Sequence, residues 1–191
     1  MKDYFLISNP NSYSIIVNKK YKLEDNYSPK DLTMINKRFS SKEIYLRKKV
    51  KNSFEKMAKK AKKLNLILIA VSGYRSSKYQ DTLFKNYVKE KGYEYASICS
   101  AKPGFSEHQT GLALDIANDN LDYDNFEYTK EFKWIKNNAH KYGFILRYPK
   151  DKISITGYKY EPWHFRYVGK KAAKIIFKNN LTLEEYIKSK D

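Results

Sequence analysis

The stretch from Ser100 to Ala117, SAKPGFSEHQTGLALDIA, runs from a polar, glycine-bearing segment into a short alternating apolar run. The alternation over Leu112–Ala117 predicts a β-strand. Upstream, the six apolar residues of Leu66–Val71, LILIAV, predict a second strand, which is buried. Helical patterns surround these strands without the regular alternation of a doubly wound sheet. We therefore expect an α+β fold.

Apolar periodicity predicts the remaining elements. Between Ser41 and Leu64, apolar residues recur at helical spacing and lysines cover the other face, which is typical of an amphipathic helix. The predicted helices cover Ser41–Leu64, Ser77–Lys91, Thr129–Tyr142, Lys170–Lys178 and Thr182–Ile187. Further strands are predicted over Phe144–Arg147 and Trp163–Val168, with a short strand at Ile15–Val17.

The length of 191 residues suits one domain. Asn-Pro, Asn-Ser and Ser-Pro turn signals indicate that the start of the chain is irregular. We predict an irregular N-terminal segment over residues 1–30 and a single domain over residues 31–191. That domain is expected to contain a small antiparallel sheet flanked by helices.

The bulk composition excludes several classes of protein. The formal net charge is +17, which is typical of proteins that meet polyanions. However, the lysines are not gathered beside aromatic residues and no zinc-finger or RNA-binding signature is present, so we expect no nucleic-acid partner. The single cysteine, Cys99, cannot form an intramolecular disulfide, and we interpret it as a small packed residue. No apolar run is long enough to span a membrane.

Two of the three histidines lie in the densest polar segments. His108 stands in SEHQTGLALD, which ends at Asp115, and His164 stands in EPWHF, which begins at Glu161. Two imidazoles and a carboxylate form a ligand set that leaves zinc a position for water. Glu161, three residues before His164, has the place of a general base. The histidines could equally be satisfied polar residues, because a His-to-Asp spacing of seven is not a standard metal motif. His140 lies outside every motif and is interpreted as structural or exposed.

Four strings occur in order along the chain: SGYRSSKYQ from residue 72, SAKPGFSEHQTGLALDI from residue 100, YGFILRYPKDK from residue 142 and TGYKYEPWHFRYVG from residue 156. Together they resemble the VanY-like D-alanyl-D-alanine carboxypeptidases. These are zinc peptidases whose family also includes L,D-carboxypeptidases and VanXY-type D,D-peptidases. The resemblance extends from about Asn18 to Tyr186, and the SxHxxGxAxD pattern followed by ExxH is specific at this spacing.

The resemblance implies a role for each matching residue. His108, Asp115 and His164 would hold one zinc ion per chain in a surface groove, and Glu161 would act as the base. Arg75 would face the peptide carboxylate or the developing oxyanion, which suits a guanidinium because its donors bind a carboxylate at two points. The other matches to the family's substrate pocket are Gln80, Ser106, Tyr148 and Trp163.

The implied function is that of a zinc-dependent D-alanyl-D-alanine carboxypeptidase. It would hydrolyse the C-terminal D-alanine of peptidoglycan stem peptides or their precursors, and we expect it to be monomeric. The alternatives are an L,D-carboxypeptidase on tetrapeptide stems, a VanXY-type D,D-dipeptidase and, from another class, a non-catalytic zinc module that binds wall peptide. The start MKDYFLISNPNS lacks signal-peptide features. We expect a cytoplasmic protein if Met1 is the native start, and an extracellular, membrane-anchored one if the chain is trimmed.

Overall fold

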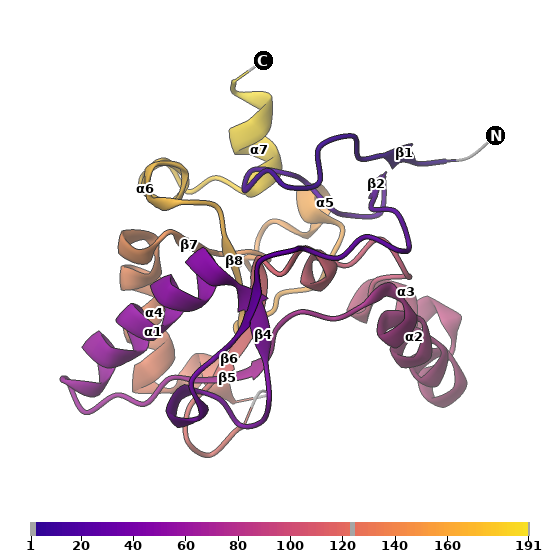
Figure 1. The fold of residues 1–191 in the computed structure, drawn as a ribbon. Coiled ribbons are helices and arrows are strands. Elements are labelled where there is room, and N and C mark those ends of the chain that lie inside the picture. Colours follow the sequence, from indigo (N-terminus) through magenta and orange to yellow (C-terminus); the bar gives the residue numbers. More distant parts are fainter. Residues whose placement is uncertain (1–2, 123–124, 191) are drawn as a thin grey trace.

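The computed structural model describes residues 3–122 and 125–190. A four-stranded antiparallel sheet with the strand order β5-β6-β8-β7 lies at its centre (Figure 1). The strands are β5 (Ile69–Ser72), β6 (Ala113–Ala117), β7 (Phe144–Leu146) and β8 (His164–Tyr167). The sheet is antiparallel, and helices alternate irregularly with its strands along the chain. The predicted α+β class is therefore confirmed.

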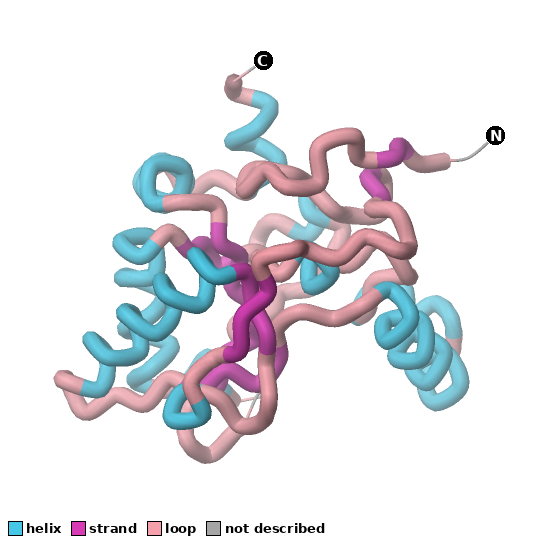
Figure 2. Tube along the Cα trace, in the orientation of Figure 1, coloured by secondary structure: helices cyan, strands magenta, loops and turns pink. Residues whose placement is uncertain are grey.

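Helices flank the sheet, as the tube in Figure 2 makes clear. In the view of Figure 1, α1, α4 and α6 lie to the left of the sheet, and α2 and α3 lie to its right. The α-helices are α1 (Lys48–Lys62), α2 (Ser77–Lys91), α3 (Tyr93–Cys99), α4 (Lys130–Asn138), α5 (Ile153–Thr156), α6 (Lys170–Lys178) and α7 (Leu183–Lys188). Short 3-10 helices are η1 (Lys37–Phe39), η2 (Glu107–Thr110), η3 (Phe126–Tyr128) and η4 (Ala139–Tyr142).

Two small sheets lie outside the central one. Strand β1 (Phe5–Leu6) pairs in parallel with β2 (Tyr21–Lys22), and β3 (Leu32–Met34) pairs antiparallel with β4 (Tyr45–Arg47). The second pairing corrects the predicted start of the first helix at Ser41. Residues 45–47 form a strand, so α1 begins only at Lys48.

The other predicted elements fare differently. The bounds of α2 and α6 are those predicted, and η4 continues α4 to the predicted end. The predicted strand at Ile15–Val17 is wrong, because Val17 is buried without strand pairing and the Ile15 carbonyl accepts a hydrogen bond from Arg166. Helix α3 was not predicted. Gly92, at φ 83°, ends α2 and caps the start of α3, so one glycine separates two helices.

The core fixes the two strands that matter for the site. Helix α1 buries Val50, Phe54 and Met57 completely, in one cluster with Leu114 of β6 and Phe165 of β8. Burying each large apolar side chain contributes roughly 1.5–3 kcal/mol. Strands β6 and β8 are therefore held rigidly from one side, while the polar residues on them can face a groove.

The N-terminal segment packs on the domain. The Leu23 amide donates to the Gly104 carbonyl, and the Gln109 side chain donates to the carbonyls of Glu24 and Tyr27. Leu23 is fully buried. These contacts place residues 23–27 against the loop that leads into η2.

Positive charge is concentrated on the helical layer of α1, α4 and α6. Residues 48–63, 130–141 and 170–178 contain 16 lysines and 2 glutamates, so they account for +14 of the formal charge of +17. The lysines are thus unevenly distributed over the molecule. None of these residues lines the groove described below. Within the described residues, no helix is both long and apolar enough to cross a membrane.

Candidate metal centre and substrate groove

Three side chains from separate parts of the chain converge at one end of the central sheet. Asp115 on β6 and His164 on β8 are register partners on adjacent antiparallel strands. His108 comes from η2, whose first turn is capped by the Ser106 hydroxyl accepting from the His108 amide at 3.3 Å. His108 and Asp115 are seven residues apart in the sequence. The turn between η2 and β6 brings their side chains together.

The three residues fit a metal site. One ligand atom from each can be chosen so that all lie within 4.8 Å of one another, and all three side chains are buried. Asp115 Oδ1 is 3.4 Å from His108 Nε2 and 3.1 Å from His164 Nδ1. Neither His108 Nε2 nor Asp115 Oδ1 has a hydrogen-bond partner among the described residues. Buried polar atoms without partners are costly, and two nitrogens with one carboxylate oxygen are the donor set that zinc prefers.

The orientation of His108 is fixed from behind by Gly73. His108 Nδ1 is 2.6 Å from the Gly73 carbonyl, so Nδ1 carries the proton and Nε2 is left with its lone pair facing the site. A Cβ at position 73 would lie 2.7 Å from the Tyr45 carbonyl and 2.5 Å from the Ile44 side chain. Only glycine lets this backbone pass so close to β4.

The pKa values of the two histidines are shifted in opposite directions. Burial and the charge of Arg75 lower the pKa of His108 to about 4. Burial alone would also lower the pKa of His164, but the carboxylates of Asp115 and Glu107 raise it to about 9. For Asp115, burial alone would raise the pKa, and the two histidines hold it well below its ordinary value. Without metal, the site therefore holds a proton on His164 at neutral pH.

Glu161 lies beside the cluster of His108, Asp115 and His164. Its Oε2 is 3.5 Å from His164 Nδ1, and the turn that carries it is closed by the His164 amide donating to the Glu161 carbonyl at 3.2 Å. Burial raises the pKa of Glu161 to about 7. A carboxyl group with a pKa near neutrality can both accept and return a proton.

The other predicted site residues line the same groove, whose volume is about 1090 Å³. The Arg75 amide donates to the His108 carbonyl at 3.2 Å, and the buried Arg75 Nε has no hydrogen-bond partner within the described part of the chain. The Gln80 side chain donates to Ser100 Oγ and to the Ala101 carbonyl, while its own oxygen has no partner among the described residues. Both residues thus line the groove, and each has one buried polar atom that pairs with no other described residue.

Aromatic side chains form much of the groove wall. The Tyr148 ring lies 4.9 Å from the His164 ring, and Trp163 is half-buried against the main core. Seven further tyrosines line the cavity: Tyr45, Tyr74, Tyr79, Tyr87, Tyr95, Tyr158 and Tyr160. Cys99, expected as a packed residue, is only partly buried and lines the groove as well. Rings that combine apolar faces with hydroxyl groups suit an extended polar ligand.

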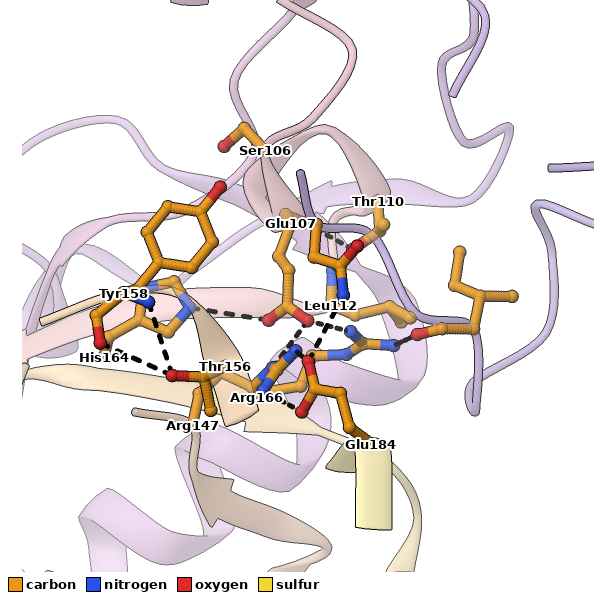
Figure 3. Close-up of polar contacts among 12 residues, drawn as sticks. Ser106, Glu107, Thr110, Leu112, Arg147, Thr156, Tyr158, His164, Arg166 and Glu184 are labelled. Carbon is orange, nitrogen blue, oxygen red and sulfur yellow. Dashed lines mark hydrogen bonds and ion pairs between the residues drawn. The ribbon is translucent and has the colours of Figure 1, made fainter. Parts of the chain in front are cut away.

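His140 is placed elsewhere, as predicted. Its ring stacks on Phe177 of α6 at 3.9 Å and does not line the groove. Glu107, however, was not predicted to belong to the site. This residue is fully buried beside His164 with Arg147 and Arg166 (Figure 3). The only available signal was the two arginines, which interrupt the apolar strand patterns FILRY and HFRYV.

Comparison with known proteins agrees with the fold and the site. The chain matches the VanY family model, D-alanyl-D-alanine carboxypeptidase, over residues 43–170. It is 49% identical to YodJ of Bacillus subtilis (strain 168) over 187 residues, which cover 94% of this chain and 68% of YodJ.

Two solved structures are similar to the whole fold. One is the LdcB LD-carboxypeptidase, with a TM-score of 0.92 and 47% identity, covering 98% of this chain and 91% of that one. The other is a mutant of the vancomycin resistance D,D-pentapeptidase VanY in complex with Zn(II). Its TM-score is 0.80 at 31% identity, covering 92% of this chain and 98% of that one.

The fold and these relatives define the class of protein as a carboxypeptidase, which is a hydrolase. More narrowly, the chain belongs to the VanY family of D-alanyl-D-alanine carboxypeptidases, so the predicted family is confirmed.

Proposed function

We propose that this protein is a zinc-dependent carboxypeptidase that removes the C-terminal D-alanine from peptidoglycan stem peptides or their precursors. The observation that carries the proposal is the convergence of His108, Asp115 and His164 within 4.8 Å on the floor of the groove, with Glu161 beside them. A non-catalytic zinc module would have no use for a buried carboxyl group next to its metal ligands.

His108, Asp115 and His164 would hold the zinc. A zinc ion bound there supplies a Lewis acid that polarises the scissile carbonyl and lowers the pKa of a water molecule. Glu161 accepts the proton of the attacking water and returns it to the leaving amino group, consistent with its pKa near 7.

Arg75 would bind the free carboxylate of the substrate. Its backbone is tied to the His108 carbonyl, which fixes the arginine at the metal-binding end of the groove. A carboxylate that enters a partly dry groove needs a permanent positive charge and donors to replace its lost water. Gln80 and Ser106 are the polar neighbours proposed to bind the terminal residue, and Tyr148 and Trp163 would form aromatic walls.

The stereochemistry of the cleaved bond is the finer part of the proposal. The family match favours D,D-cleavage, whereas the similarity to the LdcB LD-carboxypeptidase favours a second candidate, L,D-cleavage of a tetrapeptide stem. Both bonds would be cleaved by the same metal and base. The experiment is to incubate the zinc-loaded protein with synthetic stem peptides ending in one or two D-alanines and to follow the products by mass spectrometry. Loss of D-alanine only from the peptide with two D-alanines supports D,D-cleavage. Loss from the tetrapeptide alone supports L,D-cleavage, and release of neither contradicts the proposal.

A further inference from the structure

Behind His164, on the side away from Asp115, four charged residues form a buried network (Figure 3). The side chains of Glu107, Arg147 and Arg166 are completely inaccessible, and Glu184 of α7 is 16% exposed. Taking charges out of water is expensive unless each is paired and hydrogen-bonded. Because these charges are buried next to His164, we asked whether the network has a function at the candidate metal centre.

The two oxygens of Glu107 are used differently. Oε1 accepts hydrogen bonds from Arg147 Nε at 2.8 Å and from Arg166 Nη1 at 2.6 Å. Oε2 accepts no hydrogen bond from the described residues and lies 3.6 Å from His164 Nε2, which also has no hydrogen-bond partner there. The arginines thus fix the carboxylate by one oxygen and leave the other facing the imidazole.

His164 lies between two carboxylates. Its Nδ1 is 3.1 Å from Asp115 on the groove side, and its Nε2 faces Glu107 on the buried side. An imidazole binds metal through one nitrogen only when that nitrogen has no proton, so the proton must be on the other nitrogen. A carboxylate that accepts the remaining N–H fixes both the tautomer and the plane of the ring.

We propose that Glu107 is a positioning residue for the metal centre: it keeps the His164 proton on Nε2, so that the Nδ1 lone pair faces the metal. This inference rests on the proposed function, since it takes His164 as a metal ligand. Gly73 has the same relation to His108, through the 2.6 Å contact with Nδ1. His108 would therefore be oriented by the neutral carbonyl of Gly73, and His164 by the anionic carboxylate of Glu107.

The arginines hold Glu107 from elements far apart in the chain. Arg166 also donates to the carbonyls of Tyr13 and Ile15 in the N-terminal segment. Arg147 donates two hydrogen bonds to Glu184, at 2.9 and 2.6 Å. Because each guanidinium is fixed at its other end, Glu107 has little freedom to leave His164.

The experiment compares two substitutions that remove one negative charge from the same network. Glu107→Gln changes the group that faces His164, whereas Glu184→Gln changes a group that accepts hydrogen bonds from Arg147 and Asn18. Zinc dissociation constants are measured by chelator competition on the metal-free protein. Thermal melting of the metal-free protein and the absorption spectrum of the Co(II)-substituted protein are recorded in parallel. Glu107→Asp is included because it retains the charge for the arginines but withdraws the carboxylate from His164 by one methylene.

Wild-type protein is expected to bind one zinc. Glu107→Gln and Glu107→Asp are expected to weaken zinc binding about 10- to 100-fold and to alter the Co(II) spectrum. Glu184→Gln is expected to lower the melting temperature while leaving zinc affinity and spectrum unchanged. Wild-type zinc affinity in Glu107→Asp, or an equal loss in Glu184→Gln, would overturn the inference and leave the proposed function intact. A wild-type protein that binds no zinc would instead contradict the proposed function itself.

Discussion

The substitution Gly73→Ala tests how the backbone supports the metal centre. The added Cβ would lie 2.7 Å from the Tyr45 carbonyl, where ordinary contact begins at 3.4 Å. That carbonyl accepts from the Tyr74 amide at 2.8 Å, so β4 cannot easily give way. The backbone at residue 73 must therefore move by about 0.7 Å. A shift of that size would lengthen the 2.6 Å contact between the Gly73 carbonyl and His108 Nδ1 to about 3.3 Å and so weaken this hydrogen bond.

Two separate losses follow from this movement. Overpacking of this kind costs about 1–3 kcal/mol, which lowers the melting temperature of a chain of this size by roughly 2–12 °C. Releasing a metal-ligating histidine from its supporting carbonyl weakens zinc affinity about 10- to 100-fold. The assays are thermal melting of the metal-free protein and zinc competition against a chelator.

The control is Gly92→Ala. Gly92 has φ 83°, and a Cβ there would meet nothing within 4 Å. Gly92→Ala should lose about 1–3 kcal/mol of stability from backbone strain alone, because φ 83° with ψ 161° is a glycine conformation, and its zinc affinity should be unchanged. If Gly73→Ala binds zinc as tightly as Gly92→Ala does, the carbonyl of residue 73 does not orient His108 and the reasoning is refuted.

Three further outcomes are expected. Glu161→Gln should retain zinc and lose on the order of 10²- to 10⁴-fold in turnover, because only the proton transfer is removed; loss of zinc in this variant would make Glu161 a ligand. Wild-type protein should cleave a stem peptide with a free C-terminus far faster than its C-terminal amide, and Arg75→Lys should be impaired because it loses two-point binding; equal cleavage of acid and amide would contradict a carboxypeptidase. The carboxylates raise the pKa of His164 to about 9, so at pH 7 the metal-free site is protonated there and zinc must displace that proton. Calorimetry in buffers of different ionisation enthalpy should detect release of about one proton per zinc, and binding without proton release would show that His164 is already neutral.

Sequence patterns predicted those elements whose periodicity is local. Helix α2 agrees to the residue because Ser76 caps one end and Gly92 the other. The helix predicted from Ser41 failed at its start, because Leu46 fits helical spacing but is held in β4 by pairing with Thr33, a partner distant in sequence. Non-local pairing of this kind leaves no periodic signal.

Some residues of the candidate site could be predicted from the sequence and others could not. His108, Asp115, Glu161 and His164 were found because their residue types and order match a family pattern, and the structure brings them together. Glu107 was not found, although it directly precedes His108. Its proposed positioning role depends on two arginines 40 and 59 residues away, and only the folded sheet places them against it.

The measurement that tests the account most directly is the zinc content of the purified protein, compared with that of His108→Ala, Asp115→Ala and His164→Ala. The three-ligand site predicts about one zinc per wild-type chain and its loss in each variant, while the folded structure is retained by circular dichroism. Full zinc occupancy in all three variants would contradict the assignment, because the metal would then be bound elsewhere in the protein.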